Sequence, residues 1–244
     1  MSFASQDGRF RTTQWSLVAA ARDEEDPQSR LALSELCESY WQPLYVFIRR
    51  RGHSAADAED LTQGFFHQLL EKNYLSQADR DRGRFRTFLL AAVKHFLANQ
   101  AAKSGAQRRG GGHALLSLDF ALAESNYRAE PVETWTPEAL YERQWALTLL
   151  SNVVARLEQK YEQSGKGELF RWLKPTLTGG TPSSPYNEVA RQLETTTGAV
   201  KVAAHRLRDA YRRELCDAIA DTLSGDDDVE SERVLLLRAL AGDS

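Results

Sequence analysis

The sequence has few of the residue patterns on which catalytic or metal-binding assignments rest. Its two cysteines, Cys37 and Cys216, lie far apart without a histidine at metal-ligand spacing, which argues against a disulfide framework or a zinc site. Such cysteine usage is typical of a reducing compartment, so we expect a cytoplasmic protein. We also find no phosphate-binding loop, metal-ligand cluster or nucleophile elbow. We therefore predict no catalytic residue, no metal and no cofactor.

Long apolar segments and strand patterns are missing as well. The longest uninterrupted apolar run, Phe88 to Val93, is far shorter than the roughly 20 residues that cross a bilayer. The first ten residues lack the apolar core of a signal peptide, so we expect no membrane partner. Valine, isoleucine and threonine never alternate with polar residues for long enough to indicate a sheet. The sequence therefore predicts an all-α fold.

Apolar residues at helical spacing divide the chain into two predicted helical domains. The predicted parts are an N-terminal arm (1–12), a first domain (13–109), a linker (110–136), a second domain (137–223) and an acidic tail (224–244). Gly110 to Gly112 and two prolines mark the linker, where the helical periodicity fades. Pro43 lies within a helical pattern of the first domain, so we expect a kink or two abutting helices there. Arg49 to Arg51, followed by Gly52 as a left-handed cap, are predicted to end this pattern. The second domain is predicted to begin with Thr136 as cap, followed by a helix with one apolar face. That face comprises Leu140, Leu147, Leu150, Val154, Leu157 and Tyr161.

The net charge of −3, from 31 basic and 34 acidic residues, conceals an uneven distribution. Arg80 to Arg109 contains eight basic residues and one acidic residue, a net charge of +7, and Lys201 to Arg213 has a net charge of +4. The segment from Glu214 onward has a net charge of −7. Each Lys or Arg that neutralises a phosphate releases counterions, so local charge bears on nucleic-acid binding more than net charge does. A solvated helix face remains the commoner explanation for any single basic run.

The strongest local pattern predicts a helix-turn-helix. A short helix over 185–193 precedes a turn and a longer helix from Thr197 onward, and Ala190 is small where two such helices cross. The polar side of the longer helix fits a major groove of DNA. It carries Thr197, Lys201, His205, Arg206 and Arg208. Glu194 stands where the turn often has glycine, which predicts a left-handed residue or an altered turn. A plain helical hairpin is the alternative interpretation.

A second pattern, Ser54 to Phe66, predicts a helix that Ser54 caps, with Asp57, Glu59 and Asp60 in its first turns. Alone, these carboxylates could simply interact favourably with the helix dipole. The segment Asp57 to Gln63 reads Asp-Ala-Glu-Asp-Leu-Thr-Gln, and the predicted helix-turn-helix follows it later in the chain. Together these two features resemble the extracytoplasmic-function (ECF) sigma factors of bacterial RNA polymerase, in the sigma-70 family. The match covers most of 13–109 and 137–223.

The resemblance implies a promoter-recognition factor that binds core RNA polymerase and promoter DNA. It implies contact with the β′ clamp by Asp57, Glu59, Asp60 and Gln63, with the β flap as a further polymerase partner. The first domain would bind the minus-ten element through Arg84, Arg86, Lys94, His95, Asn99, Lys103, Arg108 and Arg109. The second domain would bind the minus-thirty-five element through Thr197, Lys201, His205, Arg206, Arg208 and Arg212. The family often has Ser-Arg where this chain has Val202-Ala203, which removes one expected contact.

Two details of the minus-ten contact remain open. The loop from Asn73 to Gly83 is a candidate pocket for a base held outside the stack. Phe85 and Phe88 could stack on DNA, but their spacing with Leu89 favours core packing.

Two other functions compete with the sigma-factor interpretation. One is a helix-turn-helix regulator that does not bind core polymerase. The other is a helical signalling or scaffold protein that lacks a DNA-binding face.

The regulation of the protein is also open. An anti-sigma factor or a kinase that phosphorylates Thr62 is a conceivable partner. The acidic tail, with a predicted helix over 234–240, could cover the basic second domain, contact an activator or aid solubility.

Overall fold

A computed structural model describes most of the chain. The described residues are Val18, 29–71, Leu75, Ala78, 83–104, 118–129, 135–178, 185–223 and 228–242. These residues form helices and connections without a strand, which confirms the all-α prediction. The helices are α2 (Ser29–Arg50), α3 (Ala55–Glu71), α4 (Phe85–Ser104), α5 (Phe120–Ala129), α6 (Pro137–Gln163), α7 (Gly167–Leu173), the 3₁₀ helix η3 (Lys174–Thr178), α8 (Tyr186–Gln192), α9 (Thr197–Ala220) and α10 (Val229–Ala241).

Some predictions fall on residues that the structure does not describe. The helix predicted over 13–22 is described only at Val18, which is helical and buried. The candidate base pocket over 73–83 is described only at Leu75, Ala78 and Gly83. Arg108 and Arg109 lie outside the described residues altogether.

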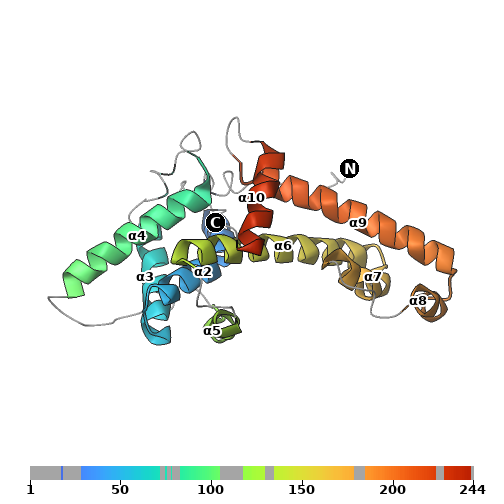
Figure 1. The fold of residues 1–244 in the computed structure, drawn as a ribbon, viewed down its shortest axis with the longest axis horizontal. Helices are drawn as coiled ribbons and strands as arrows, with labels where there is room; N and C mark the ends of the chain where they lie inside the picture. The colour runs from blue at the N-terminus through green and yellow to red at the C-terminus, as the bar shows by residue number, and fades with distance from the viewer. Residues whose placement is uncertain are drawn as a thin grey trace, which may run out of the picture.

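The long helix α6 connects two groups of helices (Figure 1). Helices α2, α3, α4 and α5 lie at one end of the molecule, and α7, α8 and the start of α9 lie at the other. Helix α10 stands between the two groups and packs on α6 and α9. The boundary predicted at residue 137 therefore falls at the start of a helix that packs on both groups. The span predicted as a linker, 110–136, contains α5, which packs on α2.

Helix α6 begins where the sequence predicts. The Thr136 hydroxyl accepts a hydrogen bond from the Ala139 amide (3.1 Å), and Pro137 occupies the first turn. Its apolar face differs from the predicted one, because Leu147 is 37% exposed. Both α2 and α10 pack on its first half, so Tyr141 and Trp145 are buried there in addition to the predicted Leu140.

Helix α2 runs through Pro43 as one helix, so the alternative of two abutting helices is wrong. Residues 43–48 are all buried, so this stretch of α2 is surrounded by protein on every side. The helix ends at a left-handed glycine, as predicted: Gly52 has φ 93°, and its amide donates to the Arg49 carbonyl (3.0 Å).

Helix α5 is fastened to α2 by a half-buried carboxylate. Glu124 accepts hydrogen bonds from Tyr45 Oη (2.7 Å) and from Arg49 Nε (2.8 Å) and Nη2 (2.9 Å). The Phe120 ring packs against Trp41 and Tyr45 at centroid distances of 5.2 and 5.4 Å. The hydrogen bonds from Arg49, opposed by burial and aided by Tyr45, lower the pKa of Glu124 from 4.5 to about 2.

This carboxylate makes folding stability depend on acid pH. Because the pKa of Glu124 is lower in the folded than in the unfolded chain, its carboxylate stabilises the folded state above about pH 4.5. This stabilisation is lost as the pH falls towards about 2. We expect Glu124→Gln to lower the free energy of unfolding at pH 6 and to flatten its decline between about pH 4.5 and pH 2, as measured by urea unfolding at each pH. Glu162→Gln, at the exposed end of α6, serves as the control and should keep the wild-type slope.

Candidate nucleic-acid interface

Helices α8 and α9 pack as a pair at the end of the molecule opposite α4 (Figure 1). Val189 and Ala190 of α8 and Val200 and Leu207 of α9 are at most 4% exposed. Ala190 is the small residue that the sequence predicts at the crossing of the two helices. Because Leu193 is also partly buried against the same core, the short α8 is held firmly on α9.

The turn between α8 and α9 has the left-handed residue that the sequence predicted. Glu194 has φ 49°, and it is the only non-glycine residue with positive φ in the part of the chain that the structure describes. The Thr195 amide then donates to the Ala190 carbonyl (2.9 Å). Thr196 caps α9, since its hydroxyl accepts from the Ala199 amide (3.1 Å). The chain thereby passes from α8 to α9 within four residues, and these hydrogen bonds fix the direction in which α9 leaves the turn.

The outer side of α9 carries an exposed basic face. Lys201, His205 and Arg206 are exposed, whereas Thr197 and Arg208 are half-buried. Lys201 and Arg206 form no ion pair with any described residue, so both cations are available to an anionic ligand. Further along α9, the Asp209 carboxylate offsets positive charge, because it lies 2.9 Å from both His205 Nδ1 and Arg212 Nη1.

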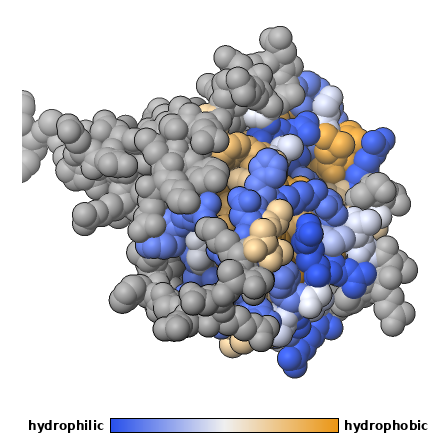
Figure 2. Space-filling view, turned by 90° about the vertical axis from the view of Figure 1, so that its left-hand side faces the viewer, coloured by the Kyte–Doolittle hydropathy of each residue, from blue (hydrophilic) through white to orange (hydrophobic). Residues whose placement is uncertain are grey.

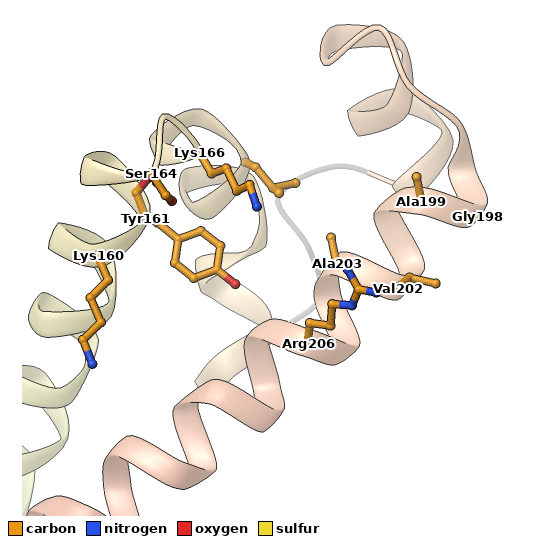
Figure 3. Close-up of a pocket in the computed structure, with 10 residues that line it drawn as sticks. Lys160, Tyr161, Ser164, Lys166, Gly198, Ala199, Val202, Ala203 and Arg206 are labelled. Atoms are coloured by element: carbon orange, nitrogen blue, oxygen red, sulfur yellow. The ribbon is translucent and has the colours of Figure 1, made fainter.

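A groove of about 520 Å³ borders this basic face (Figure 3). Tyr161 and Lys166 project into it from the α6–α7 side, and Ala203 and Arg206 face them from α9. An ion pair between Lys160 and Glu214 joins α6 to α9. Val202 is 51% exposed beside the groove, and Ala203 next to it is half-buried. These two residues form an apolar strip next to the exposed cations of α9.

The four residues predicted to bind the polymerase clamp lie in the first half of α3. Asp57 and Asp60 are exposed, and Glu59 and Gln63 are half-buried. Ser54 caps the helix as expected: its hydroxyl accepts from the Asp57 amide (3.1 Å) and donates to the Asp57 carboxylate (2.7 Å). Glu59 and Asp60 make no ion pair with a described residue, so this acidic surface is open to a basic partner.

Thr62, the candidate phosphate acceptor, is buried. It is 0% exposed, and its hydroxyl donates to the Ala58 carbonyl (2.6 Å) within α3. A kinase could reach this hydroxyl only if the packing around α3 opened.

The predicted minus-ten residues of α4 divide into exposed and paired side chains. His95 and Asn99 are exposed, whereas Lys94 is bound to Glu138 of α6 (2.7 Å). Lys103 lies in the last turn of the helix. Figure 2 looks onto this end of the molecule, where hydrophilic side chains predominate among the coloured residues. The exposed residues of α4 are small or polar: Thr87, Ala91, His95, Ala98, Asn99, Ala101 and Ala102. Its described exposed face thus offers polar side chains at His95 and Asn99 and no exposed cation.

Arg86 is placed differently from the prediction. It was expected on the DNA-facing surface, but it is 4% exposed and points into the protein. Its guanidinium donates to Glu142 of α6 (2.8 Å), lies 2.5 Å from Glu232 of α10 and covers the Trp145 ring at 4.1 Å. Burial disfavours its charge, but the two carboxylates outweigh burial and raise the pKa of Arg86 above its ordinary value. In this conformation Arg86 cannot reach DNA.

Arg84 is the half-buried neighbour of this cluster. Its Nη2 lies 2.8 Å from Glu232, and its side chain is 27% exposed. No sequence pattern singled out Glu142, Trp145 or Glu232. Only opposite charge in distant segments could indicate them, and the basic second domain was the surface that the acidic tail could cover, as one of three open roles for the tail.

Comparisons with known proteins give no relative on which to base an assignment. No family model, no curated protein and no solved structure matches the chain. Within the part of the chain that the structure describes, no group of histidine, cysteine, aspartate and glutamate side chains could hold a metal ion. None of the described helices is long and apolar enough to span a bilayer.

Proposed function

We propose that the protein is a sigma factor of the ECF type, which binds core RNA polymerase and directs it to promoters. The observation that carries this proposal is the α8–α9 pair. Its tight turn at Glu194 fixes α9, whose exposed face presents Lys201 and Arg206 without partners among the described residues. In a helix-turn-helix, such a second helix enters the major groove and its first residues lie nearest the bases.

Two further surfaces fit the same function. The acidic start of α3 offers unpaired carboxylates at Glu59 and Asp60 to a basic partner, as the resemblance implies for the polymerase clamp. The exposed side of α4 carries His95 and Asn99 at the opposite end of the molecule from α8 (Figure 1). A protein of this shape can contact two separated promoter elements, one at each end.

The decisive experiment measures binding to core polymerase and transcription together. The Asp60→Arg variant places a cation on the proposed clamp surface, so we expect its affinity for core polymerase to fall about tenfold or more, since like charge at an interface costs several kcal/mol. Run-off transcription from a promoter mapped by overexpression should fall in parallel. Binding of the free variant to DNA should not weaken, because α9 is unchanged.

Glu168→Arg is the matched control, because it makes the same change of charge at an exposed acid in the first turn of α7. It should retain core binding. A wild-type chain that binds DNA but never core polymerase would instead be a helix-turn-helix regulator. A chain that binds neither would favour the signalling or scaffold protein.

A further inference from the structure

The C-terminal helix α10 inserts a charged side chain where an amphipathic helix normally has an apolar one. Glu232, Leu236 and Ala239 are its buried residues, at 0, 2 and 8% exposed. A carboxylate is rarely buried to this extent unless a cation accompanies it. Here the cations are Arg84 and Arg86, both from the most basic segment of the chain.

The other end of α10 is also held in place. The Arg143 guanidinium donates to the Leu240 carbonyl and covers the Trp135 ring at 5.1 Å. Gly242 ends the helix with φ 87°, and a Cβ built on it would lie 2.3 Å from a Trp135 ring carbon. This close approach of backbone and ring requires glycine at position 242.

We propose that α10 is an autoinhibitory helix whose Glu232 carboxylate occupies, in place of a nucleic-acid phosphate, an anion site formed by Arg84 and Arg86. A guanidinium binds carboxylate and phosphate with the same planar fork, so the two anions compete for the same donors. Glu232 of the acidic tail thus pairs with two arginines of the basic segment Arg80 to Arg109, and not with the cations of the second domain.

The two arginines have different roles in this exchange. Arg86 keeps Glu142 and Trp145 as partners when α10 leaves, so it remains positioned. Arg84 has Glu232 as its ion-pair partner among the described residues, and its side chain is already 27% exposed. Departure of α10 therefore frees Arg84 first and uncovers Arg86 beside it. This regulation rests on the proposed function, since promoter DNA is the competing ligand.

The first test uses a charge change inside the site and a matched change outside it. Glu232→Gln removes the buried carboxylate, whereas Glu230→Gln removes an exposed carboxylate of the same helix, which pairs only with Arg233 among the described residues. Binding of the full-length variants to a fluorescein-labelled duplex with a single-stranded extension is measured by anisotropy at about 50 mM salt. We expect Glu232→Gln to tighten binding roughly tenfold, as one added charge-assisted contact would. Glu230→Gln should change it less than about twofold.

The second test displaces α10 without changing any charge. Gly242→Val would force a side chain into the Trp135 ring, so the end of α10 must leave its site. Gly52→Ala is the control for backbone strain alone, because Gly52 also has positive φ but no atom lies within 4 Å of an added Cβ. We expect Gly242→Val to tighten DNA binding and to speed amide hydrogen exchange in 229–241, and Arg84→Ala in that background to abolish the gain. Gly52→Ala should do neither.

The outcomes separate the inference from the function on which it rests. If binding depends on Lys201 and Arg206 yet neither Glu232→Gln nor Gly242→Val strengthens it, α10 is not autoinhibitory and the proposed function stands. If both variants strengthen binding and Arg84→Ala cancels the effect, the anion site is established. If no variant binds DNA, either alone or together with core polymerase, the proposed function fails and the autoinhibition fails with it.

Discussion

Replacing Arg86 with methionine is expected to lower the free energy of unfolding by about 3–5 kcal/mol, the range measured when one partner of a buried ion pair is removed. Arg86 is the common partner of two carboxylates, Glu142 and Glu232. Because Glu232 is fully buried, its carboxylate would keep only the half-buried Arg84. The loss should appear as a lower midpoint with an unchanged slope in urea unfolding.

Lys94→Met is the control for this prediction. Lys94 also joins α4 to α6, through Glu138, but both side chains are more than one third exposed. Its removal should cost about 0–1 kcal/mol, as for other exposed pairs. In the double variant Arg86→Met, Glu232→Leu, the unpaired buried carboxylate is gone, so part of the stability should return. A loss for Arg86→Met no larger than that for Lys94→Met would mean that Arg86 is solvated in solution.

Replacing Lys201 and Arg206 together with alanine is expected to weaken DNA binding roughly 100-fold, the effect of two lost charge-assisted contacts. Neither side chain has an ion-pair partner among the described residues, so little internal stability is lost with them. Each neutralised phosphate contributes about 0.9 to the slope of log affinity against log salt, so the slope should fall by about 2. Anisotropy titrations between about 50 and about 200 mM salt measure both quantities.

The control for this second prediction removes two charges from another surface. Arg156 is exposed on α6, and Lys174 pairs with Glu158 beside η3. The variant Arg156→Ala, Lys174→Ala should lose several-fold less affinity than the α9 variant, although its net charge is the same. If the two double variants lost the same affinity for DNA, α8 and α9 would be a plain helical hairpin and not a DNA-binding helix-turn-helix.

Local signals in the sequence were sufficient for the helix ends and for the turn. Ser54 and Thr136 act as predicted caps, and Gly52 is the predicted left-handed residue. Glu194 was predicted to be left-handed because it replaces a glycine in a recognisable turn, and it has φ 49°. Such features depend on side chains within about four residues, so the sequence contains all the information required.

The partners of charged side chains could not be predicted in the same way. Arg84 and Arg86 looked like exposed cations because their basic segment of the sequence contains only one acid, Asp81. Glu232, their partner, lies almost 150 residues further on and approaches only because α10 packs on α6 and α9. Leu147 was misplaced for a related reason: the buried side of α6 depends on which helices cover it.

The sequence by itself therefore determined the helices other than α5, the caps at Ser54 and Thr136, the turn before α9 and the basic face of α9, because backbone hydrogen bonding and helical periodicity are local. Only the tertiary structure decided which charges face solvent. An ion pair becomes buried only when helices that are distant in the sequence pack together. Here the packing of α10 buries Glu232 against Arg84 and Arg86, two residues that the sequence had placed on a DNA-binding surface.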